Sequence, residues 1–289
     1  MDLKERLSGK LNPAELSKLR TAFDVVGDTC IMEIPEELSA KAAEIAEAVI
    51  QVNSNIKTVY AKSGSREGDL RLRNLKLLAG LPHATIHREH GFLLKMDPAK
   101  TYFSPRESTE RQRVAGQVRP GERVLVMFSG CGPFAAAIAK RQPAVEKVFA
   151  VELNSDAAGY AAENFRLNKL MGRVVSVCGD VKEKCPPYYG TFDRVVMPLP
   201  KGAHDFLGVA VRCIRPEGGI VHFYHWAPES DLFSEAEAQA KAACRAEERK
   251  CRIMARKKVL PYGPRLWKVC IDFRVGRADR KGPIFIKAS

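Results

Sequence analysis

The segment Val124–Phe134, which reads VLVMFSGCGPF, decides the fold of this chain. An apolar run of strand-forming residues leads into a loop with Gly130 and Gly132, and a helical pattern begins at Pro133. Glycine lets a backbone approach a ligand closely and adopt angles that a Cβ atom forbids. The GxGxxG dinucleotide fingerprint would need a third glycine where this chain has Ala135. The segment therefore predicts a ligand-binding strand–loop–helix unit and disfavours a pyrophosphate ligand.

From about residue 110 onward, strand and helix patterns alternate with short turns. This alternation is typical of a doubly wound, mostly parallel sheet, so the predicted fold class is a Rossmann-like α/β domain. A smaller α/β unit is expected before it. We predict a helical lead-in at 1–22, the small α/β domain at 23–94, the Rossmann-like domain at 95–276 and a basic tail at 277–289.

Two acidic residues follow later strands of the larger domain. Glu152 ends the second strand about 20 residues beyond the glycine loop, where a carboxylate suits the two hydroxyl groups of a ribose. Asp180 follows the third strand, where it can accept a hydrogen bond from an adenine amino group. Taken alone, Glu152 is more typical of a solvated acid at a strand end. The ordered set describes a nucleoside site without a phosphate clamp, which fits S-adenosylmethionine (AdoMet).

Composition narrows the class of protein. The formal net charge of +13 over 289 residues favours a polyanionic partner such as RNA, DNA or an anionic membrane surface. No apolar run reaches about 18 residues, so no membrane-spanning helix is expected. The charged start MDLKER is unlike a signal peptide. The eight cysteines form no CxxC pair, which disfavours zinc and a disulfide framework. We expect a cytoplasmic protein without a metal.

Further motifs are specific enough to indicate a family. Residues 97–111 read DPAKTYFSPRESTER, and ENFRLN follows at 163–168. Together with GDLRLR at 68–73 and LAG at 78–80, they resemble the archaeal and eukaryotic tRNA guanine-37 N1-methyltransferases. The wyosine-pathway aminocarboxypropyl transferases are close relatives of these enzymes. The resemblance covers roughly residues 23–275, and its most specific part is YFSPR.

The resemblance implies a tRNA methyltransferase with roles at matching positions. Glu110 would be the general base that takes the N1 proton of guanine, and Arg71 would stabilise the charge that develops on O6. Guanine N1 is protonated at neutral pH, so its methylation needs a base within hydrogen-bond reach, and an arginine fork suits the oxygen. The expected partner is a tRNA anticodon loop whose target base leaves its stack. Without the resemblance, Glu110 is an ordinary helix-start acid and Arg71 a plain surface cation.

The resemblance also extends the expected cofactor site. Tyr102 and Phe103 would help to shape the site of the methyl donor. With the glycine loop and the strand ends, the expected AdoMet-binding set is Tyr102, Phe103, Phe128, Ser129, Gly130, Gly132, Pro133, Phe134, Glu152, Leu153, Asp180, Val181 and Pro198.

The segment after the fourth strand departs from the family pattern. Residues 197–203 read MPLPKGA, whereas most N1-methyltransferases have NLP there, with the asparagine on the target base. Pro198 offers no side-chain donor or acceptor and no backbone N–H, so that contact cannot form in the usual way. The MGY motif of the aminocarboxypropyl transferases is also absent. A PLP form resembles an archaeal subgroup that methylates both guanine N1 and C7 of the tricyclic wyosine intermediate. In addition, about 22 residues precede the small domain, where many members carry a tRNA-docking domain.

Three hypotheses therefore stand at this point. The first is N1 methylation of guanine 37. The second is another transfer at the same nucleotide, either C7 methylation or aminocarboxypropyl transfer. The third is a non-catalytic RNA-binding protein on the same scaffold, which the intact glycine loop with Glu152 and Asp180 disfavours.

Two further groups of residues have competing interpretations. The first group consists of basic residues near the C-terminus, which either face RNA or form a solvated helix face and tail. They are Arg245, Arg249, Lys250, Arg252, Arg256, Lys257, Lys258, Arg277, Arg280 and Lys281. The second group lies on an expected inner strand, and its side chains are expected to pack in the protein rather than to catalyse. It consists of His222, Tyr224, His225 and Trp226.

Overall fold

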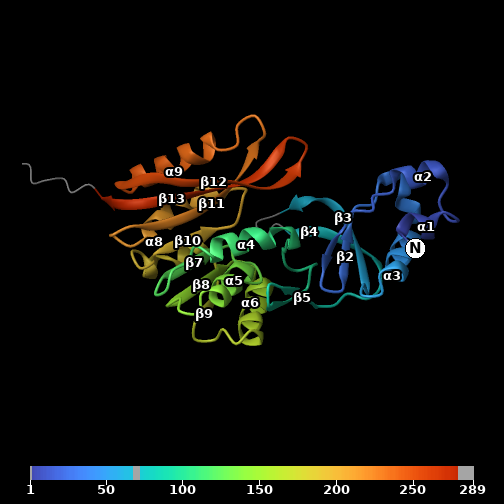
Figure 1. The fold of residues 1–289 in the computed structure, drawn as a ribbon, viewed down its shortest axis with the longest axis horizontal. Helices are drawn as coiled ribbons and strands as arrows, with labels where there is room; N and C mark the ends of the chain where they lie inside the picture. The colour runs from blue at the N-terminus through green and yellow to red at the C-terminus, as the bar shows by residue number, and fades with distance from the viewer. Residues whose placement is uncertain (1, 68–71, 279–289) are drawn as a thin grey trace, which may run out of the picture.

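The structure is a computed structural model that describes residues 2–67 and 72–278. Arg71, Arg280 and Lys281, which were assigned roles above, lie outside the described residues. Two α/β lobes lie side by side, with the smaller N-terminal lobe at one end of the larger one (Figure 1). None of the described helices has both the length and the apolar composition that crossing a membrane requires.

The larger lobe is built on a seven-stranded sheet with the order β12-β13-β11-β10-β7-β8-β9 (Figure 1). Five strands run parallel, namely β7 (Arg123–Met127), β8 (Lys147–Glu152), β9 (Val174–Cys178), β10 (Arg194–Met197) and β11 (Gly219–Pro228). The remaining two, β13 (Leu266–Ala278) and β12 (Arg249–Gly263), extend the sheet antiparallel. The prediction of a Rossmann-like, mostly parallel α/β fold is confirmed.

Helices cover both faces of this sheet because successive strand residues point to opposite sides. In β7, Val124 and Val126 join one hydrophobic core, while Leu125 and Met127 join the other. The first core is closed by α4 (Ser108–Ala115), α5 (Pro133–Arg141) and α6 (Ser155–Leu167). The second is closed by α7 (Val181–Lys184), α8 (Leu207–Cys213) and α9 (Ser234–Ala246). Short 3-10 turns complete the lobe: η2 (Pro105–Glu107), η3 (Pro186–Tyr188) and η4 (Ala203–Phe206).

The smaller lobe has a four-stranded sheet in the order β1-β2-β3-β4. Its elements are α1 (Leu3–Leu7), α2 (Pro13–Lys18), β1 (Asp24–Val26), β2 (Thr29–Met32), η1 (Glu36–Lys41), α3 (Ala42–Val52), β3 (Thr58–Glu67) and β4 (Leu72–Ala79). Leu3, Leu7, Leu11 and Leu19 are buried in the same core as α3. The residues expected as a lead-in thus pack on this lobe, and the four proposed ranges stay a prediction.

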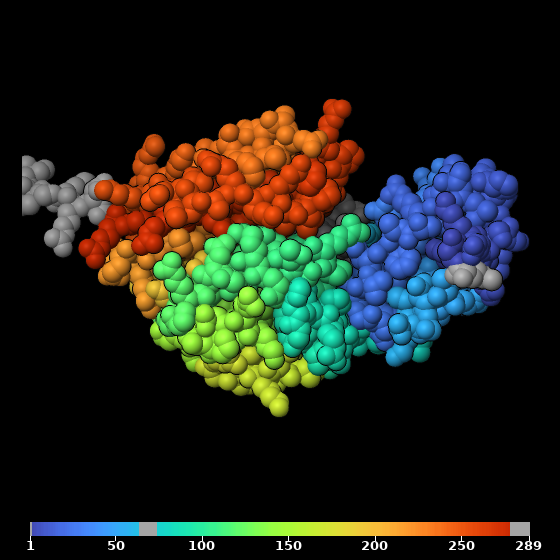
Figure 2. All heavy atoms as spheres, viewed as in Figure 1, coloured from blue at the N-terminus to red at the C-terminus, as the bar shows by residue number. Residues whose placement is uncertain are grey.

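Polar contacts join the smaller lobe to residues 83–85, which follow it in the chain, and to the larger lobe. Asp28, in the β1–β2 turn, accepts hydrogen bonds from the Thr85 hydroxyl at 2.6 Å and pairs with the His83 ring at 2.7 Å. Burial would raise the pKa of Asp28, but these bonds and Lys57 outweigh it and lower the pKa to about 2. Arg106, in η2, binds Asp24 of β1 at 2.6 Å. Figure 2 shows the small lobe set directly against the larger one.

A hairpin of β5 (Thr85–Glu89) and β6 (Phe92–Met96) lies between the lobes and is fixed to α6. The Asn164 side chain exchanges hydrogen bonds with the Lys95 amide (2.7 Å) and carbonyl (3.0 Å) and also binds the Cys131 carbonyl (3.0 Å). The Asn168 side chain likewise accepts a hydrogen bond from the Leu93 amide and donates one to the Leu93 carbonyl. The ENFRLN motif therefore joins α6, the hairpin and the glycine loop.

Replacing Asn164 by alanine should destabilise the protein by about 2–4 kcal/mol, because buried backbone groups of Lys95 and Cys131 would lose their partners. Denaturant unfolding measures the change. Glu163→Ala, at the exposed neighbouring position, should cost less than about 1 kcal/mol. Equal losses from both variants would contradict the assigned role of Asn164.

Candidate active site

The loop after β7 adopts the geometry that its glycines predicted. The φ angles of Phe128, Gly130 and Gly132 are +54°, +55° and +85°. A Cβ atom at Gly132 would lie 2.7 Å from the Phe165 ring, so the packing of α6 against the loop excludes any side chain at this position. The Gly132 amide binds the Ser129 carbonyl at 3.0 Å and closes the turn. The loop thus has a fixed conformation at the carboxyl edge of the sheet.

Glu152, at the end of β8, is joined to this loop. Its carboxylate accepts the Gly130 amide at 2.7 Å and the Asn154 amide at 2.9 Å. Burial raises the pKa of Glu152, and the bonds from Asn154 and Gly130 act in the opposite direction. Each carboxylate oxygen has a second acceptor site, so Glu152 can still receive the hydroxyl groups of a ribose.

Some of the other expected cofactor residues are packed in the hydrophobic cores, and the rest lie at the ends of strands. Phe134 and Val181 are buried in the two hydrophobic cores, and the Phe128 ring meets Phe206 edge-on at 4.9 Å. Leu153 is 47% exposed beside Glu152, and Asp180 caps α7 through the Lys182 amide at 2.7 Å. The Ser129 hydroxyl is buried and has no hydrogen-bond partner among the described residues.

These features fit a nucleoside cofactor. The unpartnered Ser129 hydroxyl and the acceptor sites on Glu152 lie at the ends of two neighbouring strands, β7 and β8, which the Gly130 amide joins. Buried polar atoms normally find a partner, so Ser129 offers a donor or acceptor for a ligand at this edge. Ligands of open α/β sheets bind at the carboxyl ends of the strands.

Residues 97–111 pass over the same edge of the sheet. The Asn154 side chain binds the Lys100 carbonyl at 2.8 Å, and the Tyr102 carbonyl lies 3.4 Å from the position of a Cβ on Gly130. Tyr102 and Phe103 line a cavity of about 80 Å³ together with β1, β2 and β3 residues of the small lobe. The segment is therefore held between the small lobe and the glycine loop.

Pro198, after β10, is tied to this segment by a buried lysine. Lys268 of β13 donates to the Pro198 carbonyl at 3.1 Å and to the Glu107 carboxylate at 2.8 Å. The Tyr102 hydroxyl donates to the same Glu107 carboxylate at 3.4 Å. Although Pro198 has no polar side chain, its backbone carbonyl is thus a fixed point of the site.

Glu110 lies on α4, beyond Glu107, and only 4% of its surface is exposed. The Arg113 guanidinium donates to both carboxylate oxygens at 2.8 Å, and the Tyr224 hydroxyl donates to Oε1 at 2.6 Å. Burial raises the pKa of Tyr224 well above its ordinary value, so the hydroxyl keeps its proton and remains a donor. Oε1 thus receives two bonds and Oε2 one, which leaves Oε2 with a further acceptor site.

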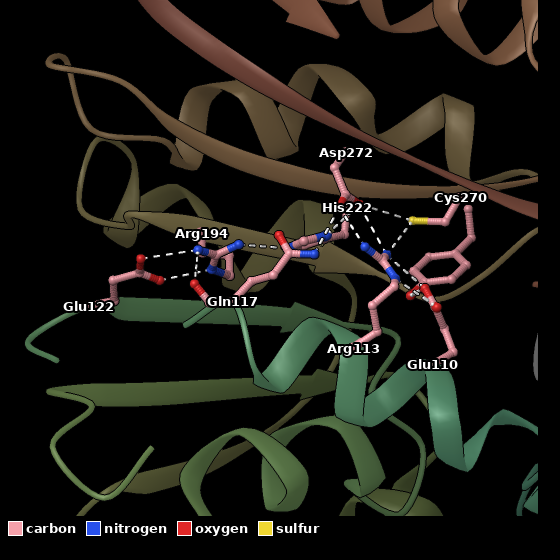
Figure 3. A network of polar contacts seen from close by, with 9 residues as sticks. Glu110, Arg113, Gln117, Glu122, Arg194, His222, Cys270 and Asp272 are labelled. Atoms are coloured by element: carbon pink, nitrogen blue, oxygen red, sulfur yellow. Dashed lines mark hydrogen bonds and ion pairs between the residues drawn. The ribbon is translucent and has the colours of Figure 1, made fainter. Parts of the chain in front are cut away.

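A polar network continues from Arg113 across the sheet (Figure 3). Arg113 pairs with Asp272 at 2.6 Å, and the His222 Nδ1 atom lies 2.7 Å from the same carboxylate. Arg194 contacts the His222 Nε2 atom at 2.8 Å and pairs with Glu122 at the far end. The network therefore links α4 to β13, β11 and β10.

Comparison with known proteins assigns this architecture to a family. The sequence model of the TRM5/TYW2 methyltransferase domain matches residues 85–254, and that of the TYW2 N-terminal domain matches residues 3–83. The chain belongs to the TRM5/TYW2 methyltransferase family. The resemblance stated from the sequence is thereby confirmed.

Relatives of both branches of the TRM5/TYW2 family are similar to this chain. The tRNA (guanine(37)-N(1))-methyltransferase Trm5b of Pyrococcus abyssi is 42% identical over 265 residues, covering 91% of this chain and 78% of that protein. Its crystal structure superposes with a TM-score of 0.83 at 41% identity, over 92% of this chain and 78% of the other. A tRNA(Phe) (4-demethylwyosine(37)-C(7)) aminocarboxypropyltransferase of Pyrococcus horikoshii is 32% identical over 274 residues, or 94% and 96% of the two chains. The structure of aTrm5 with tRNALeu has a TM-score of 0.82 and 31% identity, over 96% of this chain and 78% of that chain.

A group of potential metal ligands also occurs in this TRM5/TYW2 fold. Ligand atoms of His222, Cys270 and Asp272 lie within 4.8 Å of one another. However, Arg113 donates to Asp272 and to the Cys270 sulfur, and Arg194 occupies the outer nitrogen of His222. Two guanidinium groups thus already supply positive charge, and the donor set does not favour a metal ion.

The basic residues predicted near the C-terminus do not share one role. The expectation that Arg249 faces RNA is wrong. Its guanidinium instead donates to the carbonyls of Gly276 and Arg215 at 2.7 Å and so joins these two backbone segments. Arg256 pairs with Glu237, and Lys258 lies 3.4 Å from the centre of the Trp267 ring. Exposed basic side chains remain along β12 and nearby at Arg245, Lys250, Arg252, Arg256, Lys257 and Arg277.

Several residues of the site escaped the sequence analysis. Arg113, Lys268 and Asp272 were assigned no role, and Tyr224 and His222 were expected to pack. Both of the latter are buried, as packing predicts, but each also carries a polar contact of the network. A charged residue on an otherwise apolar strand, such as Lys268 or Asp272, was the signal available in the sequence.

Replacing Glu152 by glutamine should raise the Kd for AdoMet by roughly 10–100-fold, because one amide group would face the N–H donors of Gly130 and Asn154 and the acceptor for ribose would be lost. Isothermal titration calorimetry of the folded variant measures this. Glu163→Gln on α6, which breaks only an exposed pair with Lys95, is the matched control. An unchanged Kd in Glu152→Gln would remove Glu152 from the cofactor site.

Proposed function

We propose that this chain is an AdoMet-dependent tRNA methyltransferase that methylates N1 of guanosine 37 in the anticodon loop and works in the cytoplasm. One observation carries the proposal: Lys100 and Tyr102, in the segment 97–111 that ends near Glu110, contact Asn154 and the Gly130 loop, and Glu152 binds the amides of both Gly130 and Asn154. In our proposal, this segment carries the base for the target close to the nucleoside site. The 42% identity to a protein named for the same reaction supports it.

The chemistry divides between the cofactor and the chain. AdoMet, when bound, supplies an electrophilic methyl group on its sulfonium. The chain has to bind it through the Gly130 loop and Glu152, hold the guanine and remove the proton from N1. In our proposal, Oε2 of Glu110 takes this proton through its remaining acceptor site. Because Glu110 is almost fully buried beside Arg113 and Tyr224, our proposal requires a local opening around α4 before the guanine can reach it.

The remaining expected roles complete the proposal. Arg71, which lies outside the described residues, would stabilise the negative charge on guanine O6. The tRNA backbone would meet the exposed basic side chains of β12, because phosphate contacts come chiefly from lysine and arginine. The structure of a relative with tRNALeu supports tRNA as the partner class.

A second candidate is a wyosine-pathway transfer to the same nucleotide. The match of residues 3–83 to the TYW2 N-terminal domain favours it, and so does a relative named as an aminocarboxypropyltransferase at 32% identity. Such an enzyme would transfer the aminocarboxypropyl group of AdoMet, or a methyl group, to C7 of the tricyclic base. The PLP sequence at Pro198 keeps C7 methylation among the outcomes to be tested.

Glu110→Gln should lower kcat for methylation of an unmodified tRNA transcript by roughly 10²–10⁴-fold, because glutamine cannot take the N1 proton. The Kd for AdoMet should stay within about 2-fold of the wild-type value, since Glu110 is not part of the proposed cofactor site. Single-turnover kinetics with labelled AdoMet measure the first quantity and calorimetry the second. An unchanged kcat would rule out Glu110 as the base.

Identification of the product nucleoside decides between the candidates. Mass spectrometry of digested tRNA should show 1-methylguanosine at position 37 after incubation of unmodified transcript with the wild-type enzyme. Product formation only on tRNA carrying the tricyclic intermediate, with a methyl or aminocarboxypropyl mass, would support the second candidate instead. AdoMet binding without any product would favour the non-catalytic hypothesis.

A further inference from the structure

We propose that Asp272 and His222 are positioning residues for Glu110 and act on it through Arg113. This inference rests on the proposed function, because it requires Glu110 to be the base of the reaction. It concerns strands β11 and β13, to which the sequence motifs of the site assign no role.

Arg113 is the link between the base and the sheet. Its Nε and Nη2 atoms bind the two oxygens of Glu110, while Nη1 and Nη2 bind the two oxygens of Asp272 at 2.6 and 3.2 Å. Glu110 and Arg113 lie one turn apart on α4, whereas Asp272 lies on β13. A planar fork shared by two carboxylates has little freedom to turn, so Asp272 fixes the plane in which Arg113 holds Glu110.

His222 fixes Asp272 in turn, and the network determines its tautomer. A guanidinium has no acceptor, so Arg194 must donate to Nε2 of His222 at 2.8 Å. The ring proton therefore lies on Nδ1, which donates to Asp272 at 2.7 Å. Burial lowers the pKa of His222 and keeps the ring neutral. Arg194, at the end of the network away from Glu110, is itself held in place because it pairs with Glu122 and donates to the Gln117 carbonyl.

Asp272 keeps its negative charge in this setting. Burial would raise its pKa, but the hydrogen bonds from His222 and Arg113 and the positive charge of Arg113 outweigh burial and hold the pKa well below its usual range. Gln117 donates a further bond at 3.1 Å. Asp272 is thus a fixed anion on the far side of Arg113 from Glu110, and it shares the positive charge that would otherwise act on Glu110 alone.

The charges around Glu110 support a role in proton transfer. The groups facing it are Arg113 on its own helix, Tyr224 on β11, and Cys270 and Asp272 on β13. Burial raises the pKa of both Tyr224 and Cys270 well above ordinary values, so both remain neutral. Lys268, 4.9 Å from the Tyr224 ring, is paired with Glu107. The network contains the carboxylates Glu110, Asp272 and Glu122 but only two guanidinium groups, so uptake of one proton brings its formal charge to zero.

Asp272→Asn should therefore lower kcat by roughly 10–100-fold, the range seen for outer groups that orient a functional side chain. The KM for tRNA and the Kd for AdoMet should not change. Arg113 would then act on Glu110 without a competing anion, which stabilises the ionised base. The acidic limb of the pH profile of kcat should accordingly move to lower pH. A purely structural role of Asp272 would not move this limb.

The decisive experiment is a double-mutant cycle on the full-length enzyme, with Asp272→Asn, Glu110→Gln and the combination. If Asp272 acts through Glu110, its substitution should have less than about a 2-fold effect on kcat once Glu110 is glutamine. Asp193→Asn is the matched control, since it weakens a part-buried ion pair with Arg215 at the opposite, amino edge of the sheet. It should lower the melting temperature without moving the pH profile.

Two results would overturn the proposal. Equal factors of loss from Asp272→Asn in the wild-type and Glu110→Gln backgrounds would show that Asp272 acts independently of Glu110. An unmoved acidic limb in Asp272→Asn would show that it does not tune the base. If Asp272→Asn does not fold, Arg113→Lys replaces it, because lysine keeps the charge but loses the fork, and the same cycle and limits apply. Failure of the proposed function is seen separately, as absence of 1-methylguanosine with the wild-type enzyme.

Discussion

The hydrogen bond from the Gly130 amide to the Glu152 carboxylate is the contact on which the rest of the site depends. It joins the ends of two neighbouring parallel strands, β7 and β8, and it requires the backbone angle of Gly130. Glu152 also orders the Asn154 amide, and the Asn154 side chain then holds the Lys100 carbonyl. The segment that carries the proposed base is in this way positioned by the loop that would carry the cofactor.

The second half of the site is built from buried charge. Glu107 with Lys268, and Glu110 with Arg113 and Asp272, are largely removed from water. Such pairs contribute little net stability, because desolvation offsets much of the attraction between the charges. Their effect is geometric, since a guanidinium or ammonium with several fixed acceptors allows few alternative arrangements. This explains why strands β11 and β13, far from the glycine loop in sequence, determine how α4 presents Glu110.

The TRM5/TYW2 family includes relatives named for different transfers to position 37 of tRNA, so family membership does not fix the acceptor atom. Pro198 removes a polar side chain from the edge of the sheet, yet its carbonyl is held by Lys268, which also holds Glu107. Pro198 is therefore part of the same polar cluster as Tyr102. In our proposal, the choice of acceptor atom would then depend on the orientation of this cluster as a whole rather than on one side chain.

The sequence by itself determined the class of fold and predicted the edge of the sheet at which the cofactor would bind. Alternating strand and helix patterns, Gly130 and Gly132, and Glu152 at a strand end are local signals, because hydrophobic periodicity and backbone freedom act over a few residues. The tertiary structure alone decided which charges meet. Asp272 lies 159 residues from Arg113 in the chain, and Lys268 lies 161 from Glu107. Arg249, which in sequence belongs to a basic run, turns inward to bind carbonyl groups. Such contacts depend on the order of strands in the sheet, for which no periodicity in the sequence gives a signal.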